Sequence, residues 1–124
     1  VNHHTMRQAR GFFLSLLEAE REAEREREAQ DHAAEIEEHR ARYAAVTTAT
    51  GELERVAITL NKLDPIRDGA KFRELGAEAR EHYDMLKSWD AKPKEGAAKD
   101  LYSRFERIDA RKERDRSAEL SMSM

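Results

Sequence analysis

Cysteine is absent from the 124-residue chain, and glycine and proline are scarce, with five and two residues respectively. The absence of cysteine excludes disulfide bonds and thiol catalysis, although it leaves the cellular compartment open. Glycine and proline are the residues that most often interrupt helices or form turns, so their scarcity favours long helices. Because β-branched residues are sparse as well, we expect an all-α protein.

The chain also lacks long apolar runs, and it has little material for a large core. No run approaches the roughly 20 apolar residues that span a bilayer, so we expect no membrane span. Although 39% of the residues are hydrophobic, 19 of these are alanine, which leaves 29 larger side chains. This composition predicts one small domain or an elongated helical element with a slim core.

Charged residues make up 40% of the chain, and the formal net charge of −3 hides an acidic stretch. Residues 18–38 contain ten acidic residues and three arginines. Within this stretch Glu20, Glu24 and Glu28 are spaced by four, so they lie along one side of a helix. Two interpretations stay open: a solvated helix face, and an acidic stripe that docks a basic partner.

Helix-forming residues dominate from about residue 5 to residue 48, which predicts one long N-terminal helix. The segment 46–51 is expected to end it, because β-branched residues weaken a helix and Gly51 favours a left-handed C-terminal turn. Thr50 is then expected to cap a second helix, with Glu52 and Glu54 in its first turn.

Apolar residues at helical spacing extend that second helix to residue 63, where Asp64-Pro65 interrupts it. A third helix is predicted from Asp68-Gly69, with Asp68 as its cap, to about residues 88–90. Residues 92–96 have the composition of a linker, and a last helix begins near Ala97.

Together these elements predict a long N-terminal helix packed antiparallel against shorter helices, in a helical hairpin or coiled-coil-like bundle. The hairpin covers residues 1–90, residues 91–97 form a linker, and residues 98–124 form a C-terminal helix with a frayed or partner-bound tail. With a turn near residue 50, residue i faces roughly residue 100 − i. Phe12 and its apolar neighbours then meet Tyr83, Leu86 and Trp89.

A two-helix ribbon is too thin to cover all of its large apolar side chains, and the uncovered ones are candidates for binding a partner. They lie near the start of the long helix, at the end of the third helix and on the last helix. The candidates are Phe12, Phe13, Leu16, Leu17, Trp89, Leu101, Phe105 and Ile108. Packing within the chain is the alternative for the first five.

Arginines are frequent in the C-terminal helix, where Arg104, Arg107, Arg111 and Arg114 form a candidate nucleic-acid arm. Four acidic residues interrupt the run of basic residues between Arg104 and Arg116. A solvated helix end is therefore the alternative interpretation.

Motifs of catalysis and of metal binding are absent from the sequence. It contains no Gly-rich phosphate loop, no nucleophile elbow and no convincing acid/base pair, so we expect that the protein is not an enzyme. Each of His32, His39 and His82 follows a glutamate by four residues, but the paired Glu-x-x-His motifs of di-iron bundles are missing. We therefore expect neither a metal site nor a cofactor.

The sequence thus predicts a non-enzymatic helical structural or adaptor subunit that acts by protein–protein contacts within a larger assembly. The expected partner is a protein, for which a basic surface is one candidate feature, and homo-oligomerisation is an alternative. An accessory nucleic-acid-binding protein is the alternative function. We expect an intracellular location. Mitochondria are one candidate, because the first 17 residues contain Arg7 and Arg10 and no acidic residue.

Overall fold

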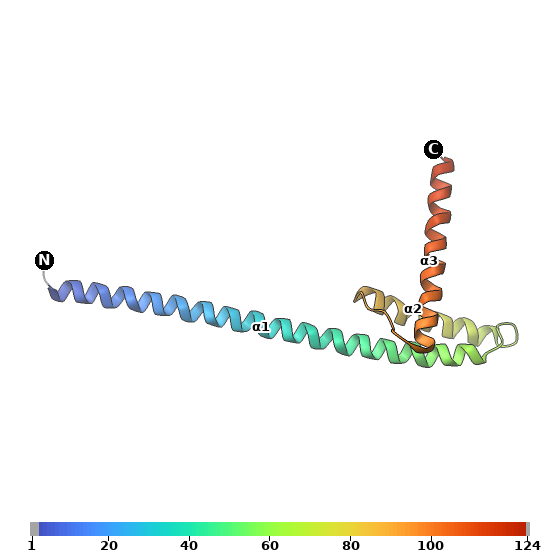
Figure 1. Cartoon of the computed structure of the whole chain (residues 1–124), viewed down its shortest axis with the longest axis horizontal. Coiled ribbons are helices and arrows are strands. Elements are labelled where there is room, and N and C mark those ends of the chain that lie inside the picture. The colour runs from blue at the N-terminus through green and yellow to red at the C-terminus, as the bar shows by residue number, and fades with distance from the viewer. Residues whose placement is uncertain (1–2, 124) are drawn as a thin grey trace. The chain divides into compact units, whose positions relative to one another are not determined.

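A computed structural model describes residues 3–123 of the chain and contains three helices (Figure 1). Helix α1 covers His3–Lys62, α2 covers Gly69–Ser88 and α3 covers Gly96–Ser123. The described part of the chain contains no strand. The predicted all-α class, with a long N-terminal helix packed against shorter helices, is confirmed.

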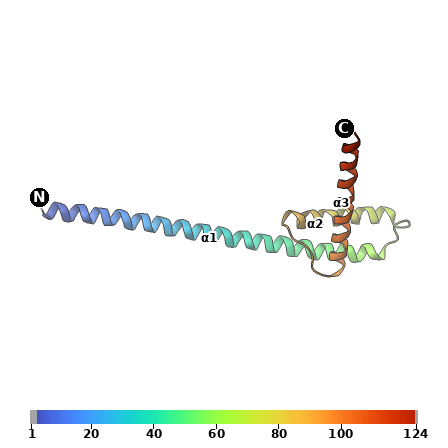
Figure 2. The same cartoon turned by 45° about the horizontal axis from the view of Figure 1, so that its top comes forward.

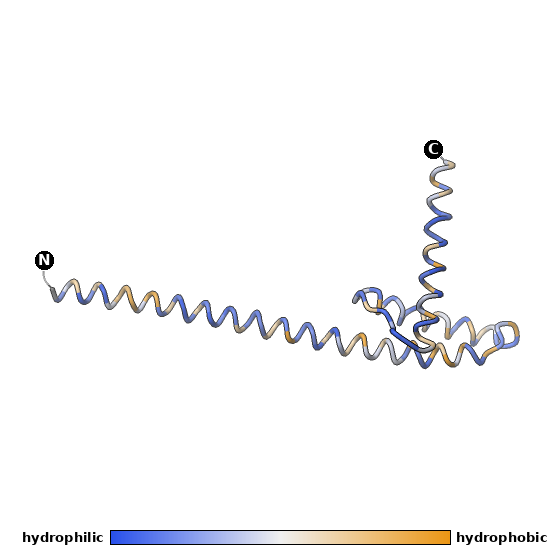
Figure 3. The backbone as a smooth tube through the Cα atoms, in the orientation of Figure 1, coloured by the Kyte–Doolittle hydropathy of each residue, from blue (hydrophilic) through white to orange (hydrophobic). Residues whose placement is uncertain are grey.

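The chain divides into two compact units, with the boundary between Ala41 and Arg42 inside α1. In the first unit every residue from His4 to Ala41 is exposed except Leu17, which is half-buried. The start of α1 contains several apolar residues and the following turns are mainly hydrophilic, as the colours in Figure 3 show. The first unit is therefore helical but has no core of its own.

The second unit holds the hydrophobic core. Helix α2 runs back beside the C-terminal part of α1, and α3 crosses this pair, as both views show (Figures 1 and 2). Tyr83, Leu53, Leu86 and Val56 are the largest fully buried side chains. Several buried alanines pack with them. The buried members of the cluster are Ala49, Leu53, Val56, Leu60, Leu75, Ala79, Tyr83, Leu86, Ala91, Ala98 and Tyr102.

Helix α1 does not end at residues 46–51, where the sequence predicted its end. It continues through Gly51, and Glu52 and Glu54 lie inside it rather than in the first turn of a new helix. Ala49 and Leu53 are buried on either side of this glycine. Their burial holds the backbone helical where local propensity is weak, because packing of an apolar face outweighs propensity in most protein helices.

The chain reverses at residues 63–68, beyond the end of α1. The backbone N–H of Ile66 donates to Asp64 Oδ1 at 2.9 Å, and that of Asp64 donates to Asp68 Oδ2 at 3.0 Å. The predicted interruption at Asp64-Pro65 is thus confirmed. Asp68 occupies the N-cap position of α2 as predicted, but its carboxylate makes no cap hydrogen bond there.

The predicted register, with a turn near residue 50, is wrong because the turn lies after Lys62. Phe12 and Phe13 were expected under the third helix but are 69% and 61% exposed. Tyr83 packs instead against Tyr102 and Phe105, which belong to α3. A shift in the turn changes every pairing, since side-chain partners across two antiparallel helices depend on where the chain reverses.

Helix α3 is anchored by a carboxylate from α1. Glu54 Oε1 accepts the backbone N–H of Ala97 at 3.1 Å, and Oε2 accepts that of Ala98 at 2.6 Å. A negative charge is favourable there, because the first N–H groups of a helix lack internal partners and carry the positive end of its dipole. Gly96 allows this approach with a φ of 80°.

No helix in the described range, residues 3–123, is both long enough and apolar enough to cross a membrane.

We predict that Gly96→Ala lowers the free energy of unfolding by about 1–3 kcal/mol, through backbone strain and a weakened cap. A Cβ at this position would lie 2.8 Å from Glu54 Oε2. The matched control is Gly51→Ala, since a Cβ at Gly51 meets nothing within 4 Å. This control should stabilise the protein by about 0.5–1 kcal/mol.

Urea denaturation of both variants measures the two effects. Equal effects of the two alanines, or a stabilising Gly96→Ala, would contradict the proposed role of Gly96 and Glu54.

Candidate functional site

The N-terminal apolar candidates are on the surface of the first unit. Phe12, Phe13 and Leu16 are exposed, together with Leu14, and Leu17 is half-buried. Together they form a short apolar surface, which we call the N-terminal apolar patch. Monomeric proteins rarely leave such a cluster of large apolar side chains uncovered, and an exposed cluster often marks a contact site.

The acidic candidates Glu20, Glu24 and Glu28 are exposed on the same unit. Within the described residues none of the three takes part in an ion pair. No cation in the described range is therefore paired with these carboxylates, which leaves the stripe available to a partner.

The remaining apolar candidates belong to the second unit and are mostly part of its core. Trp89, Leu101 and Phe105 are half-buried and pack against the core cluster, whereas Ile108 is exposed. Leu101, Phe105 and Ile108 also line a cavity of about 220 Å³. Its other apolar walls come from α1 and α2 and include Leu60 and Phe72.

Aromatic rings and cations meet where α2 and α3 touch. The ring of Tyr83 lies 4.8 Å from that of Tyr102 and 5.1 Å from that of Phe105, centroid to centroid. The guanidinium of Arg80 lies within about 5 Å of the Tyr83 and Phe105 rings, in cation–π geometry. Burial raises the pKa of the Tyr83 and Tyr102 hydroxyls, so both remain neutral at physiological pH.

Arg80 also binds Asp109 of α3. Its Nη2 donates to Asp109 Oδ1 and Oδ2, both at 2.7 Å. The hydrogen bond from Arg80 is the main cause that lowers the pKa of Asp109. The pair therefore links α2 to α3 beside the aromatic rings, which is a structural role.

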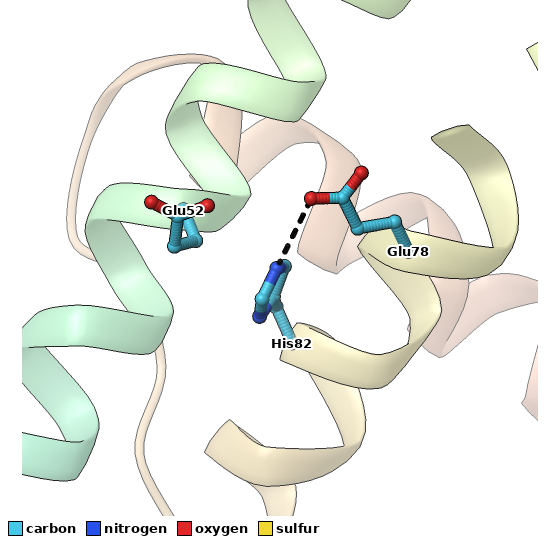
Figure 4. Close-up of side chains that lie close together, drawn as sticks. All are labelled: Glu52, Glu78 and His82. Atoms are coloured by element: carbon cyan, nitrogen blue, oxygen red, sulfur yellow. Dashed lines mark ion pairs between the residues drawn. The ribbon is translucent and has the colours of Figure 1, made fainter. Parts of the chain in front are cut away.

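One group of potential metal ligands occurs in the described range: Glu52, Glu78 and His82, with one ligand atom from each within 4.8 Å of the others. Glu52 comes from α1, and the other two come from α2 (Figure 4). His82 Nε2 lies 3.8 Å from Glu78 Oε1, which is too long for a hydrogen bond. The sequence spacing indicated the Glu78–His82 pair. It did not indicate Glu52, because the expected helix end near residue 50 gave a wrong register between the segments that form α1 and α2.

A guanidinium already engages both carboxylates of this group. Arg55 Nη2 donates to Glu52 Oε2 and to Glu78 Oε1, both at 2.7 Å. This contact with Arg55 lowers the pKa of Glu52. Since Arg55 supplies the compensating charge, the group acts as an ion-pair network that connects α1 to α2.

The candidate nucleic-acid residues Arg104, Arg107, Arg111 and Arg114 are all exposed on α3. Their spacing of three, four and three residues places them on one face of the helix. Two acids of the same helix are engaged elsewhere, since Asp109 binds Arg80 and Glu106 lies 3.0 Å from Lys92 Nζ. The acids that interrupt the arginines in the sequence are thus partly separated from them in space.

No known protein family, no curated protein and no solved structure shows significant similarity to this chain.

We predict that Asp109→Asn lowers the free energy of unfolding by about 1 kcal/mol near neutral pH, since both partners of the pair are about one-third exposed and screened by water. The native pKa of Asp109 is depressed, so its contribution is present above the ordinary carboxyl pKa and is lost as the pH falls through the depressed value. The stability difference should stay constant between about pH 5 and 8 and shrink below about pH 4.

Asp84→Asn is the matched control, because Asp84 lies 3.7 Å from Arg80 Nε and is 64% exposed. Thermal unfolding over this pH range compares the two variants. An equal loss in the control, or a difference that grows in acid, would contradict the assigned role of Asp109.

Proposed function

We propose that the chain is a non-enzymatic helical structural or adaptor subunit, which acts by protein–protein contact within a larger assembly. The observation that carries this proposal is the N-terminal apolar patch. Phe12, Phe13 and Leu16 are exposed in a unit that has no core to receive them. Burying such side chains contributes about 1.5–3 kcal/mol each, which makes a partner surface the favourable place for them.

The difference in burial between the two units supports this function. The second unit has its own buried core, with Leu53, Val56 and Tyr83 almost fully removed from water. The first unit extends the same helix with exposed side chains throughout, apart from Leu17. A folded unit that carries a helix with an uncovered apolar face is typical of helix-in-groove recognition.

The charges next to the patch indicate the chemistry of the partner. Glu20, Glu24 and Glu28 follow the patch along the helix and are exposed. A partner with an apolar groove and a basic rim would match both features, and its binding would weaken with salt. An intracellular location, with mitochondria as one candidate compartment, forms part of the proposal.

We expect the double substitution Phe12→Ser/Leu16→Ser to abolish partner binding without unfolding the protein, because neither side chain belongs to the core. Stability should change by less than about 0.5 kcal/mol. The measurement is cross-linking mass spectrometry on complexes of the full chain, which identifies the partner and the contacting residues.

Ile66→Ser is the matched control, since Ile66 is 91% exposed but lies in the turn of the second unit. The control should keep the cross-links between the segment 12–17 and the partner. Partner capture that survives the double substitution, or that is lost equally in the control, would reject the patch as the binding surface.

A second candidate function is accessory nucleic-acid binding through α3. It is supported by Arg104, Arg107, Arg111 and Arg114, which are exposed and share one face. None of these four arginines forms an ion pair with another described residue. Unpaired arginines along a helix face can contact successive phosphates.

If α3 binds nucleic acid, replacing these four arginines with glutamine should remove binding to a single-stranded RNA or duplex DNA oligonucleotide at low salt. Fluorescence anisotropy measures this binding. The control replaces Arg21, Arg25 and Arg27 of α1 with glutamine and should leave the affinity unchanged. Absence of binding by the unmodified protein at low salt would remove this candidate function.

A further inference from the structure

The exposed face of the first unit has large side chains at one end and small ones at the other. Phe12, Leu16, Ala19 and Ala23 follow each other at spacings of four, three and four residues, so they lie on one face of α1. All four are exposed. We call this face the Phe-to-Ala stripe.

We infer that a second copy of the chain covers this stripe in antiparallel orientation, over about residues 5–30. The inference rests on the proposed function and names the partner. The two-fold axis lies between Leu17 and Glu18, so that Phe12 of each copy packs on Ala23 of the other and Leu16 on Ala19. The same patch serves both copies, as in the two-fold interfaces that most homodimers use.

Side-chain size favours this orientation over a parallel one. The distance between packed helices is about 8–10 Å and depends on the side chains at the contact. A parallel pair would place Phe12 on Phe12 and Ala23 on Ala23. The two helix axes would then have to be far apart at Phe12 and close together at Ala23, only about 16 Å further along the helix. The antiparallel pair places a large residue against a small one at each level and keeps the gap uniform.

Charge favours the same orientation. Residues 5–17 contain Arg7 and Arg10 and no acid, whereas residues 18–30 contain six glutamates and three arginines. An antiparallel pair brings the basic segment of one copy onto the acidic segment of the other. A parallel pair would instead bring each acidic segment beside its own copy, where like charges repel.

The test uses the full chain, which contains no cysteine and therefore accepts single cysteines without background. In the antiparallel pair, two copies of Ala19→Cys lie about 4–5 Å apart along the helix axis, and two copies of Ala23→Cys lie about 16 Å apart. We expect a short bismaleimide to link Ala19→Cys dimers and not Ala23→Cys dimers. Efficient linking of both variants would show a parallel pair and overturn the inference.

Sedimentation equilibrium provides the independent measurement. The unmodified protein should be a dimer, and Leu16→Glu should weaken the dimer at least about tenfold. The double variant Arg7→Glu/Arg10→Glu should weaken it by about three- to tenfold, because the acidic segment of each copy then lies beside an acidic segment of the other. An unchanged dimer in this variant would overturn the antiparallel orientation.

The outcome separates this inference from the proposed function. A monomer at tens of micromolar, with no cross-link in either cysteine variant, overturns self-association. In that case capture of a different protein by the segment 12–17 would still support the adaptor function. Loss of both results would reject both.

Discussion

The structure depends on the burial of one stretch of α1 against α2 and α3. Leu53 and Val56 are fully removed from water, and each such side chain contributes about 1.5–3 kcal/mol. Gly51 within the same helix costs about 1 kcal/mol relative to alanine. Burial outweighs this cost, so α1 continues to Lys62 instead of ending near residue 50, and the position of the hairpin turn follows.

The polar links of the second unit surround this core and join its helices. Glu54 of α1 caps α3, Arg80 of α2 binds Asp109 of α3, and Arg55 of α1 holds Glu78 of α2. Each link pairs groups that lie at least 23 residues apart in the sequence. Partly exposed polar links contribute little net stability compared with the burial of apolar side chains, so they follow from this arrangement of the helices more than they cause it.

The first unit lacks such a core, and this contrast is what connects the structure to a function. Its apolar patch and its glutamates lie on one exposed helix, where neither is satisfied by the described residues of the same unit. Protein–protein contact is the proposal that uses both features. Pairing with a second copy accounts for both features, since the same segment supplies large and small side chains and both signs of charge.

The sequence by itself determined the helical class, the interruption at Asp64-Pro65 and the exposure of the charged residues between positions 18 and 38 of α1. These properties follow from local composition and from proline chemistry, which act within a few residues. The sequence also indicated the Glu78–His82 pair, but it could not show that Glu52 and Arg55 lie beside this pair. Only the tertiary structure decided that Gly51 stays helical, that Glu54 caps α3 and that Phe12 and Phe13 are left exposed. The reason is that each of these depends on which distant segment packs against α1, and burial between distant segments is not encoded in local periodicity.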